Sequence, residues 1–120
     1  MLTGAEVMAF VPSSDLDRSL DFYGRTLGLE LLMRDDFACQ FPGIRVTRVD
    51  EPARAPYTVL GWRVSDIEAS VRELSDRGVV FQSYDWMDQD ELGIWTAPSG
   101  ARIAWFNDPD DNTLSLAQVA

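Results

Sequence analysis

SDLDRSLDFY (residues 14–23) and SDIEASVREL (residues 65–74) are two versions of one stretch, separated by 51 residues. Six positions match by identity or by chemical type: Ser14 with Ser65, Asp15 with Asp66, Leu16 with Ile67, Asp17 with Glu68, Ser19 with Ser70 and Leu20 with Val71. Farther along, Gly28 and Gly78 align after a slip of one residue, and each is expected to end a helix in left-handed geometry. Because self-similarity at a fixed spacing is typical of repeated units, the chain is predicted to hold two copies of one unit.

Both stretches carry the pattern of an amphipathic helix. Their apolar positions fall on one helical stripe in each copy: Leu16, Leu20, Tyr23 and Leu27 in the first, and Ile67, Val71 and Leu74 in the second. Ser14 or Asp15 is expected to begin the first helix. Ser65 and Glu68 form a capping box that is expected to begin the second.

Runs rich in β-branched and aromatic residues surround each predicted helix. One run precedes each helix, and the others follow it: residues 6–12, 30–34, 37–41 and 44–49 in the first copy, and 57–64, 79–84, 92–97, 101–106 and 113–118 in the second. Each copy is therefore predicted to be a β-α-β-β-β unit of an α+β protein. We expect a single domain of residues 1–120, with units at about 5–50 and 57–120, in which each helix covers one sheet face and leaves the other free.

Composition narrows the classes of partner. The 120 residues include 10 arginines and no lysine against 20 acidic residues, a net charge of −10. Such a charge disfavours nucleic acid and anionic membrane surfaces and favours a neutral or cationic small molecule, although acidity also serves plain solubility. No apolar run is long enough to span a bilayer, and the N-terminus lacks the basic residues of a signal peptide. Cys39, the single cysteine, is expected in the core of a cytoplasmic protein.

The absence of histidine restricts the chemistry most. It removes the commonest general base and the commonest transition-metal ligand, so Ser-His-Asp and Cys-His nucleophilic sites are excluded. A base would have to be a carboxylate of raised pKa, a tyrosine or an activated serine such as Ser115.

Two β-α-β-β-β units, with SDLDRSLDFYGRTLGLEL (residues 14–31) opening the first and FNDPDDNTLSL (residues 106–116) closing the second, resemble the vicinal oxygen chelate superfamily of glyoxalase I, bleomycin-resistance proteins and extradiol dioxygenases. The resemblance covers nearly the whole chain. It implies a curved, mixed, mostly antiparallel sheet in a half-open barrel, with helices on the outer face. It also implies a homodimer with a ligand cleft in each concavity.

Enzymes of that superfamily hold a divalent metal on the first strand of each unit and on the last strand. The matching positions here are Met8, Val59 and Ser115, with Arg45 or Thr47 in the first unit, and none is a usual metal ligand. The expectation is therefore no metal and no cofactor. The acidic run Asp108-Pro-Asp-Asp-Asn112 begins like a calcium loop but lacks its glycine and final glutamate, so a tight turn is expected.

Alternation along the strands predicts which side chains face the concavity. Met8 and Phe10 are assigned to the concave face in the first unit. Tyr57, Arg63 and Ser115 are assigned to the concave face in the second. Trp62 is expected in the core. The segment of residues 81–95 adds further candidates for ligand binding: Tyr84, Trp86, Asp88, Glu91 and Trp95. Aromatic rings beside carboxylates suit a flat or cationic ligand. The alternative is a solvated loop that closes a barrel edge or a dimer interface.

The sequence thus predicts a metal-free, dimeric, cytoplasmic protein that binds a small organic molecule, cationic or aromatic. The resemblance is strongest to the bleomycin-resistance branch, whose members sequester drugs in an acidic, aromatic-lined cleft. A metal-independent lyase or isomerase with a carboxylate base, such as Asp88 or Glu91, is the alternative. Whether the protein is an enzyme stays open at this point.

Overall fold

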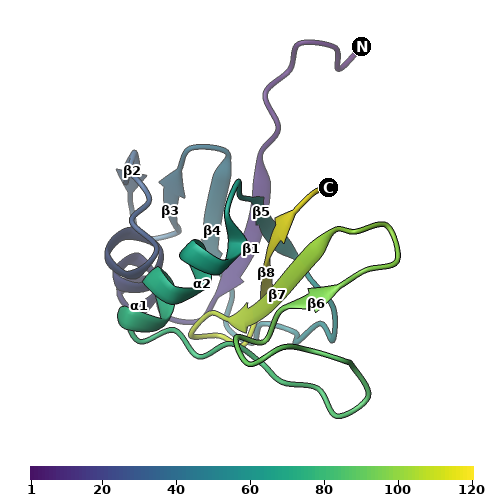
Figure 1. The fold of residues 1–120 in the computed structure, drawn as a ribbon. Helices are drawn as coiled ribbons and strands as arrows, with labels where there is room; N and C mark the ends of the chain where they lie inside the picture. Colours follow the sequence, from purple (N-terminus) through teal and green to yellow (C-terminus); the bar gives the residue numbers. More distant parts are fainter. The chain divides into compact units, whose positions relative to one another are not determined.

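The computed structural model describes all 120 residues, and the chain divides into two compact units, Met1–Ala53 and Arg54–Ala120. Each unit is a four-stranded sheet with helical structure against it (Figure 1). The first unit contains β1 (Ala9–Ser13), α1 (Leu16–Leu20), the π-helix η1 (Asp21–Thr26), β2 (Met33–Arg34), β3 (Ala38–Phe41) and β4 (Ile44–Arg48). The second contains β5 (Leu60–Arg63), α2 (Ile67–Asp76), β6 (Trp95–Thr96), β7 (Arg102–Asn107) and β8 (Thr113–Gln118).

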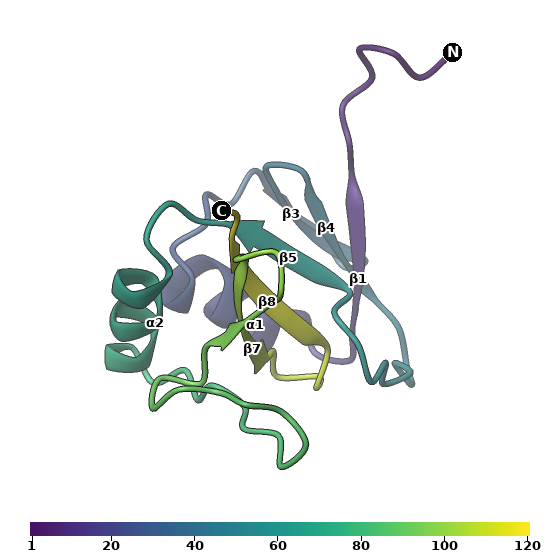
Figure 2. The ribbon, with the colours of Figure 1, turned by 45° about the vertical axis from the view of Figure 1, so that its right-hand side comes forward.

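The two sheets have the same topology. Their strand orders are β1-β4-β3-β2 and β5-β8-β7-β6, and in each the first strand pairs in parallel with the last while the other pairs are antiparallel. Figure 2 shows β5, β8 and β7 of the second unit side by side, with α2 at one side. The predicted α+β fold of two β-α-β-β-β units is confirmed.

The helix starts are equivalent in the two units. Asp15 and Asp66, which are 51 residues apart, both have extended backbone geometry, and each side chain accepts a hydrogen bond of 3.1 Å from a backbone N–H three residues on. The capping box predicted at Ser65 is wrong by one residue, because the residue that caps α2 is Asp66, whose side chain accepts from the N–H of Ala69. Gly28 and Gly78 both have positive φ, as predicted for residues that end a helix.

The first helix departs from regular α geometry in its second half. The N–H of Leu27 bonds to the carbonyl of Phe22, five residues back, over a distance of 2.9 Å, which is the π-helical pattern. Gly24, a weak helix former, lies inside this segment. Tyr23 is fully buried there and packs on Phe41 of β3, with ring centroids 6.0 Å apart.

Residues 79–84 do not form the predicted strand. This segment makes an isolated bridge between Phe81 and Phe106, and the N–H of Gln82 bonds to the carbonyl of Trp105. Beyond that point the side chain of Gln89 bonds to the N–H of Tyr84 and to the carbonyl of Gln82. Because these backbone groups are already paired with a side chain, the segment continues as a loop instead of a ladder.

The helix-facing side of each sheet forms a hydrophobic core. The buried apolar residues are Val11, Leu16, Tyr23, Ala38, Cys39, Phe41, Ile44 and Val46 in the first unit, and Ile67, Val71, Val79, Ile94, Ala104, Phe106, Leu114 and Leu116 in the second. Trp62, predicted in the core, is half-buried and stacks on the fully buried Phe106, with ring centroids 6.4 Å apart, so it lies at the edge of the core. Burial raises the pKa of the Cys39 thiol. No helix is long and apolar enough to cross a membrane.

The capping assignment makes a prediction for stability. Replacing Asp66 with Ala should lower the free energy of unfolding by about 1 kcal/mol, because an N–H of the first turn of α2 loses its acceptor. Asp66→Asn should retain most of the stability, since its side chain still accepts. Ser65→Ala is the matched control and should have little effect. Urea unfolding curves test this, and a larger loss for Ser65→Ala than for Asp66→Ala would contradict the assignment.

Candidate functional site

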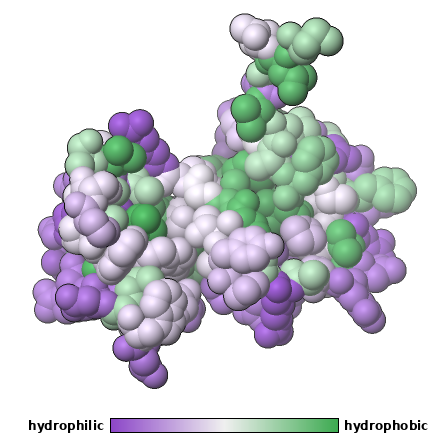
Figure 3. Space-filling model, turned by 90° about the vertical axis from the view of Figure 1, so that its right-hand side faces the viewer, coloured by the Kyte–Doolittle hydropathy of each residue, from purple (hydrophilic) through white to green (hydrophobic).

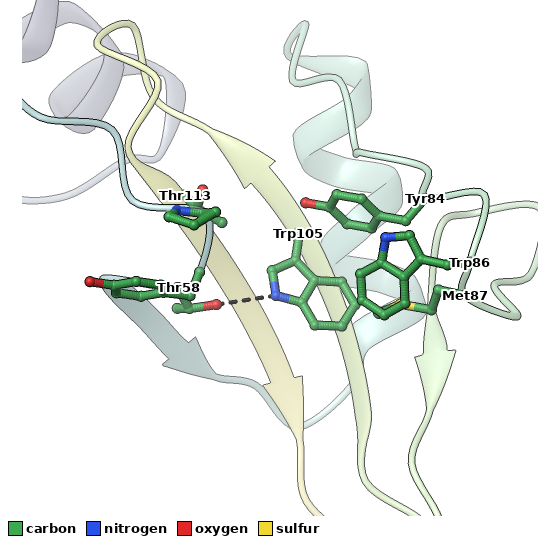
Figure 4. A pocket seen from close by; sticks show the side chains of 8 residues that line it. Thr58, Tyr84, Trp86, Met87, Trp105 and Thr113 are labelled. Atoms are coloured by element: carbon green, nitrogen blue, oxygen red, sulfur yellow. Dashed lines mark hydrogen bonds between the residues drawn. The ribbon is translucent and has the colours of Figure 1, made fainter.

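A cavity of about 300 Å³ lies in the second unit, on the sheet face opposite α2. Aromatic side chains dominate its wall, and no charged side chain lines it. The lining residues are Pro56, Tyr57, Thr58, Tyr84, Trp86, Met87, Trp105 and Thr113. Figure 4 shows Tyr84 and Trp86 on one side, Thr58 and Thr113 on the other, and the indole of Trp105 between them.

The register of the sheet explains the place of Trp105. It pairs with Ser115 of β8, which pairs in turn with Gly61 of β5, so these residues share one face. Its neighbours Ala104 and Phe106 point to the opposite face and are fully buried in the core. The face that lacks a helix therefore carries the largest side chain of β7.

Trp105 is fixed by contacts on several sides. Its indole Nε1–H donates to Thr58 Oγ1 over 3.1 Å, reaching across β8 to the segment that precedes β5. Its ring also meets Tyr84 edge-on at 6.0 Å and Trp95 at 6.2 Å. Such aromatic contacts each stabilise the arrangement by about 0.5–1.5 kcal/mol beyond area burial. Trp105 is thus a rigid floor for the cavity.

Two aromatic residues of the cavity wall are largely exposed. Trp86 is 78% exposed and Tyr57 is 66% exposed. Trp86 contacts Tyr84, with ring centroids 5.7 Å apart. Large ring faces left in water are a favourable surface for an apolar ligand to cover.

The acidic candidates lie apart from these rings. Asp88 lines a neighbouring hollow of about 360 Å³ together with Asp90 and Trp95, and Glu91 is exposed and lines neither space. Trp95 contacts Trp105 but does not line the aromatic cavity. Arg63 lies in a third hollow, beside Gln118. The structure therefore brings Tyr57, Tyr84 and Trp86 together from the predicted set and leaves Asp88, Glu91 and Arg63 outside.

Ser115 packs closely against Gly61 of the neighbouring strand. It is only 8% exposed, while Gly61 beside it has no side chain. A Cβ atom at Gly61 would lie 2.9 Å from Ser115 Oγ and 3.1 Å from the Ser115 carbonyl oxygen. Ser115 therefore fills the space beside Gly61, and a larger residue at position 61 would have to displace Ser115.

Met8 and Phe10 belong to the first unit. Phe10 is 64% exposed and pairs with Arg45 of β4, whereas its neighbour Val11 is fully buried in the core. Met8 is also exposed. Figure 3 shows apolar side chains gathered below the protruding N-terminal segment. Phe10 therefore lies on the face of its sheet that no helix covers.

The acidic run is a turn, as predicted. Asp108 is buried, and its Oδ1 accepts from the N–H groups of Asp110 and Asn112 at 2.9 and 3.0 Å. Its Oδ2 accepts from Asn112 Nδ2 at 2.8 Å. Asp111 has a left-handed φ of 61°. The carboxylate that a cation would need is already committed to the backbone of its own loop.

The metal site of the resembled enzymes does not fit these side chains. No group of three or more His, Cys, Asp or Glu residues lies close enough together to hold a metal ion. The resemblance predicts the ligand positions at Val59 and Ser115 in the second unit and at Met8 with Arg45 or Thr47 in the first. None of these donates the imidazole, thiolate or carboxylate that transition metals prefer.

Trp105 is the main residue that sequence reasoning missed, together with Thr58, Pro56 and Met87. The run ARIAWF (residues 101–106) is apolar at four successive positions, so its alternation does not reveal which face each residue takes. The register with β8 does reveal it, because Trp105 pairs with Ser115. Ser115 is assigned to the concave face, and its pairing with Trp105 across the β7–β8 hairpin would have placed Trp105 on that face as well.

Comparisons with known proteins agree with this architecture. The family model described as Glyoxalase/Bleomycin resistance protein/Dioxygenase superfamily matches residues 6–116. A search of curated proteins finds no significant match.

Several solved structures are similar over almost their full length. A member of the glyoxalase/bleomycin resistance protein/dioxygenase superfamily from Sphaerobacter thermophilus has a TM-score of 0.73 and 23% identity, covering 95% of this chain and 97% of that one. TnmS3, an antibiotic binding protein from Streptomyces sp. CB03234, has a TM-score of 0.68 and 26% identity, covering 94% and 93%. TioX from Micromonospora sp. ML1 has a TM-score of 0.72 and 18% identity, covering 98% and 100%.

Proposed function

We propose that this chain, which belongs to the glyoxalase/bleomycin resistance protein/dioxygenase superfamily, binds a flat aromatic organic molecule in the cavity of its second unit. The observation that carries the proposal is the pair of exposed rings, Trp86 and Tyr57, at the wall of a cavity that also contains Trp105. A planar ligand would cover these ring faces and remove them from water. Stacking and burial would both favour binding.

The part of the ligand inside the cavity is proposed to be uncharged. A buried cation requires a nearby carboxylate, and the candidates Asp88 and Glu91 do not line this cavity. The polar side chains that line it carry hydroxyls, those of Thr58, Thr113 and the tyrosines. The Thr113 hydroxyl donates to the carbonyl of Ala55 and Thr58 Oγ1 accepts from Trp105, but each keeps hydrogen-bonding capacity that suits a carbonyl or hydroxyl substituent. This favours the aromatic alternative over the cationic one.

A contact to Ser115 is a further part of the proposal. Ser115 pairs with Trp105, so its hydroxyl lies on the sheet face that carries the cavity. A polar substituent of the ligand would reach this hydroxyl. Met8 and Phe10, on the open face of the first unit, remain predicted ligand contacts, and Trp95 is proposed to act by supporting Trp105.

A small-molecule binding role has support from one similar structure. TnmS3, 26% identical to this chain, is described as an antibiotic binding protein. The positions predicted for the superfamily's metal ligands carry Met8, Val59 and Ser115 here. We therefore propose a metal-independent binding protein that forms a homodimer. The single, buried cysteine is consistent with a cytoplasmic location. The lyase or isomerase alternative would require a carboxylate in the cavity, and none lines it.

Two fluorescent probes of similar shape test the ligand class. At neutral pH 1-aminoanthracene is neutral and proflavine is cationic, and both have three fused rings. The neutral probe should bind more tightly at moderate salt, because the cavity offers rings and no carboxylate. Fluorescence titration measures both affinities. Tighter, salt-sensitive binding of proflavine would instead support a cationic ligand held by the acidic residues.

The exposed ring of Trp86 provides a second test. Trp86→Ala should weaken the binding of 1-aminoanthracene about tenfold, which corresponds to the loss of one stacking contact. Phe37→Ala is the matched control, because it removes another exposed aromatic ring, in the first unit. Equal affinities of the Trp86→Ala variant and the unmodified protein would place the probe elsewhere.

Native mass spectrometry tests metal independence and the homodimer together. The protein, purified without a metal-affinity tag, should have the mass of a dimer, carry no stoichiometric metal and keep its probe affinity in the presence of a chelator. A stoichiometric transition metal whose removal abolishes binding would refute the proposal of a metal-independent site.

A further inference from the structure

The loop that carries Tyr84 and Trp86 is closed by one side chain. Gln89 Oε1 accepts from the backbone N–H of Tyr84 at 2.7 Å. Gln89 Nε2 donates to the carbonyl oxygens of Gln82 at 3.0 Å and Gly93 at 2.8 Å. The amide thus uses its acceptor and both donors to join the two ends of the loop.

Gln89 is itself tied to the sheet. Its backbone forms a bridge with Trp95 of β6, and the side chain is half-buried. The adjoining turn is fixed by Asp90, whose Oδ1 accepts from the N–H groups of Leu92 and Ile94, both at 2.9 Å. Gly93 completes this turn with a positive φ of 84°. The loop is therefore anchored to β6 rather than free in solvent.

The hydrogen bonds of the Gln89 side chain have a direct consequence for the cavity. The hydrogen bond to the Tyr84 N–H fixes the first residue of a turn that ends with Met87, whose N–H bonds to the Tyr84 carbonyl at 3.1 Å. Tyr84, Trp86 and Met87 all line the cavity. Gln89 does not line it. The side-chain amide of Gln89 thus fixes the position of one wall of the cavity.

We propose that Gln89 is a positioning residue, which holds Tyr84 and Trp86 against the Trp105 floor before any ligand arrives. The inference rests on the proposed binding function and adds to it the residue that pre-organises the site. A loop already ordered loses less conformational entropy on binding, so the ligand binds more tightly than to a mobile loop. Gln89 acts through Tyr84 and Trp86 and makes no contact with the ligand.

The chemistry of the amide suggests the informative substitutions. Gln89→Met keeps the length of the side chain and removes all three hydrogen bonds. Gln89→Glu keeps an acceptor for the Tyr84 N–H but cannot donate to the carbonyl oxygens of Gln82 and Gly93, which it would repel. Glu91→Gln is the control in the same loop, because Glu91 is exposed and lines neither hollow.

The affinity for 1-aminoanthracene is measured in a double-mutant cycle. Gln89→Met and Gln89→Glu should each weaken binding about tenfold in the full protein, whereas Glu91→Gln should leave it unchanged. If Gln89 acts through the ring of Trp86, Gln89→Met should have a much smaller effect when Trp86 is already alanine. Equal affinity of Gln89→Met and the unmodified protein, or an equal loss in both backgrounds, would overturn the proposal.

The near-ultraviolet circular dichroism of the ligand-free protein supplies a second readout. The coupled rings of Tyr84, Trp86, Trp105 and Trp95 should give a signal that Gln89→Met reduces, while urea unfolding remains cooperative. Failure of the unmodified protein to bind the probe would count against the binding function alone. An unchanged dichroism spectrum of Gln89→Met would count against the role of Gln89, whatever the probe does.

Discussion

In each unit a single helix has to cover a four-stranded sheet, and it covers only one of the two faces. This constraint divides every strand into residues that pack under the helix and residues that do not. In β7, Ala104 and Phe106 enter the core while Trp105 is left on the other side. In the second unit the face without a helix carries a layer of aromatic rings, and the cavity lies within that layer.

The aromatic layer is held by a small number of directional contacts. Trp105 is oriented by Thr58 on one side and by Tyr84 on the other, and the loop bearing Tyr84 is oriented by Gln89. The acidic residues of the same loop serve other purposes. Asp90 stabilises a turn and lies 3.9 Å from Arg102. The strongly negative sequence and the uncharged cavity are thus compatible, because no acidic side chain lines the cavity.

The repeat, the helices and the acidic turn could be predicted because each rests on local chemistry. Asp108 accepts from backbone N–H groups of its own loop, and Gly28 ends its helix with a positive φ. Trp105, the floor of the cavity, could not be predicted from local chemistry in this way. Trp105 lies in an apolar run without visible alternation, and its face depends on pairing with β8. The loop of residues 81–95 was ambiguous for a similar reason, since Gln89 replaces a strand ladder with side-chain hydrogen bonds.

The most direct test of the aromatic cavity is to follow the indole N–H resonances of the four tryptophans by NMR during titration with 1-aminoanthracene. Trp105 and Trp86 line the cavity, whereas Trp62 stacks on Phe106 on the opposite face of the sheet and serves as an internal control. The account predicts saturable shifts for Trp105 and Trp86 and none for Trp62. Shifts that are largest at Trp62, or absent from all four signals at saturating probe, would contradict it.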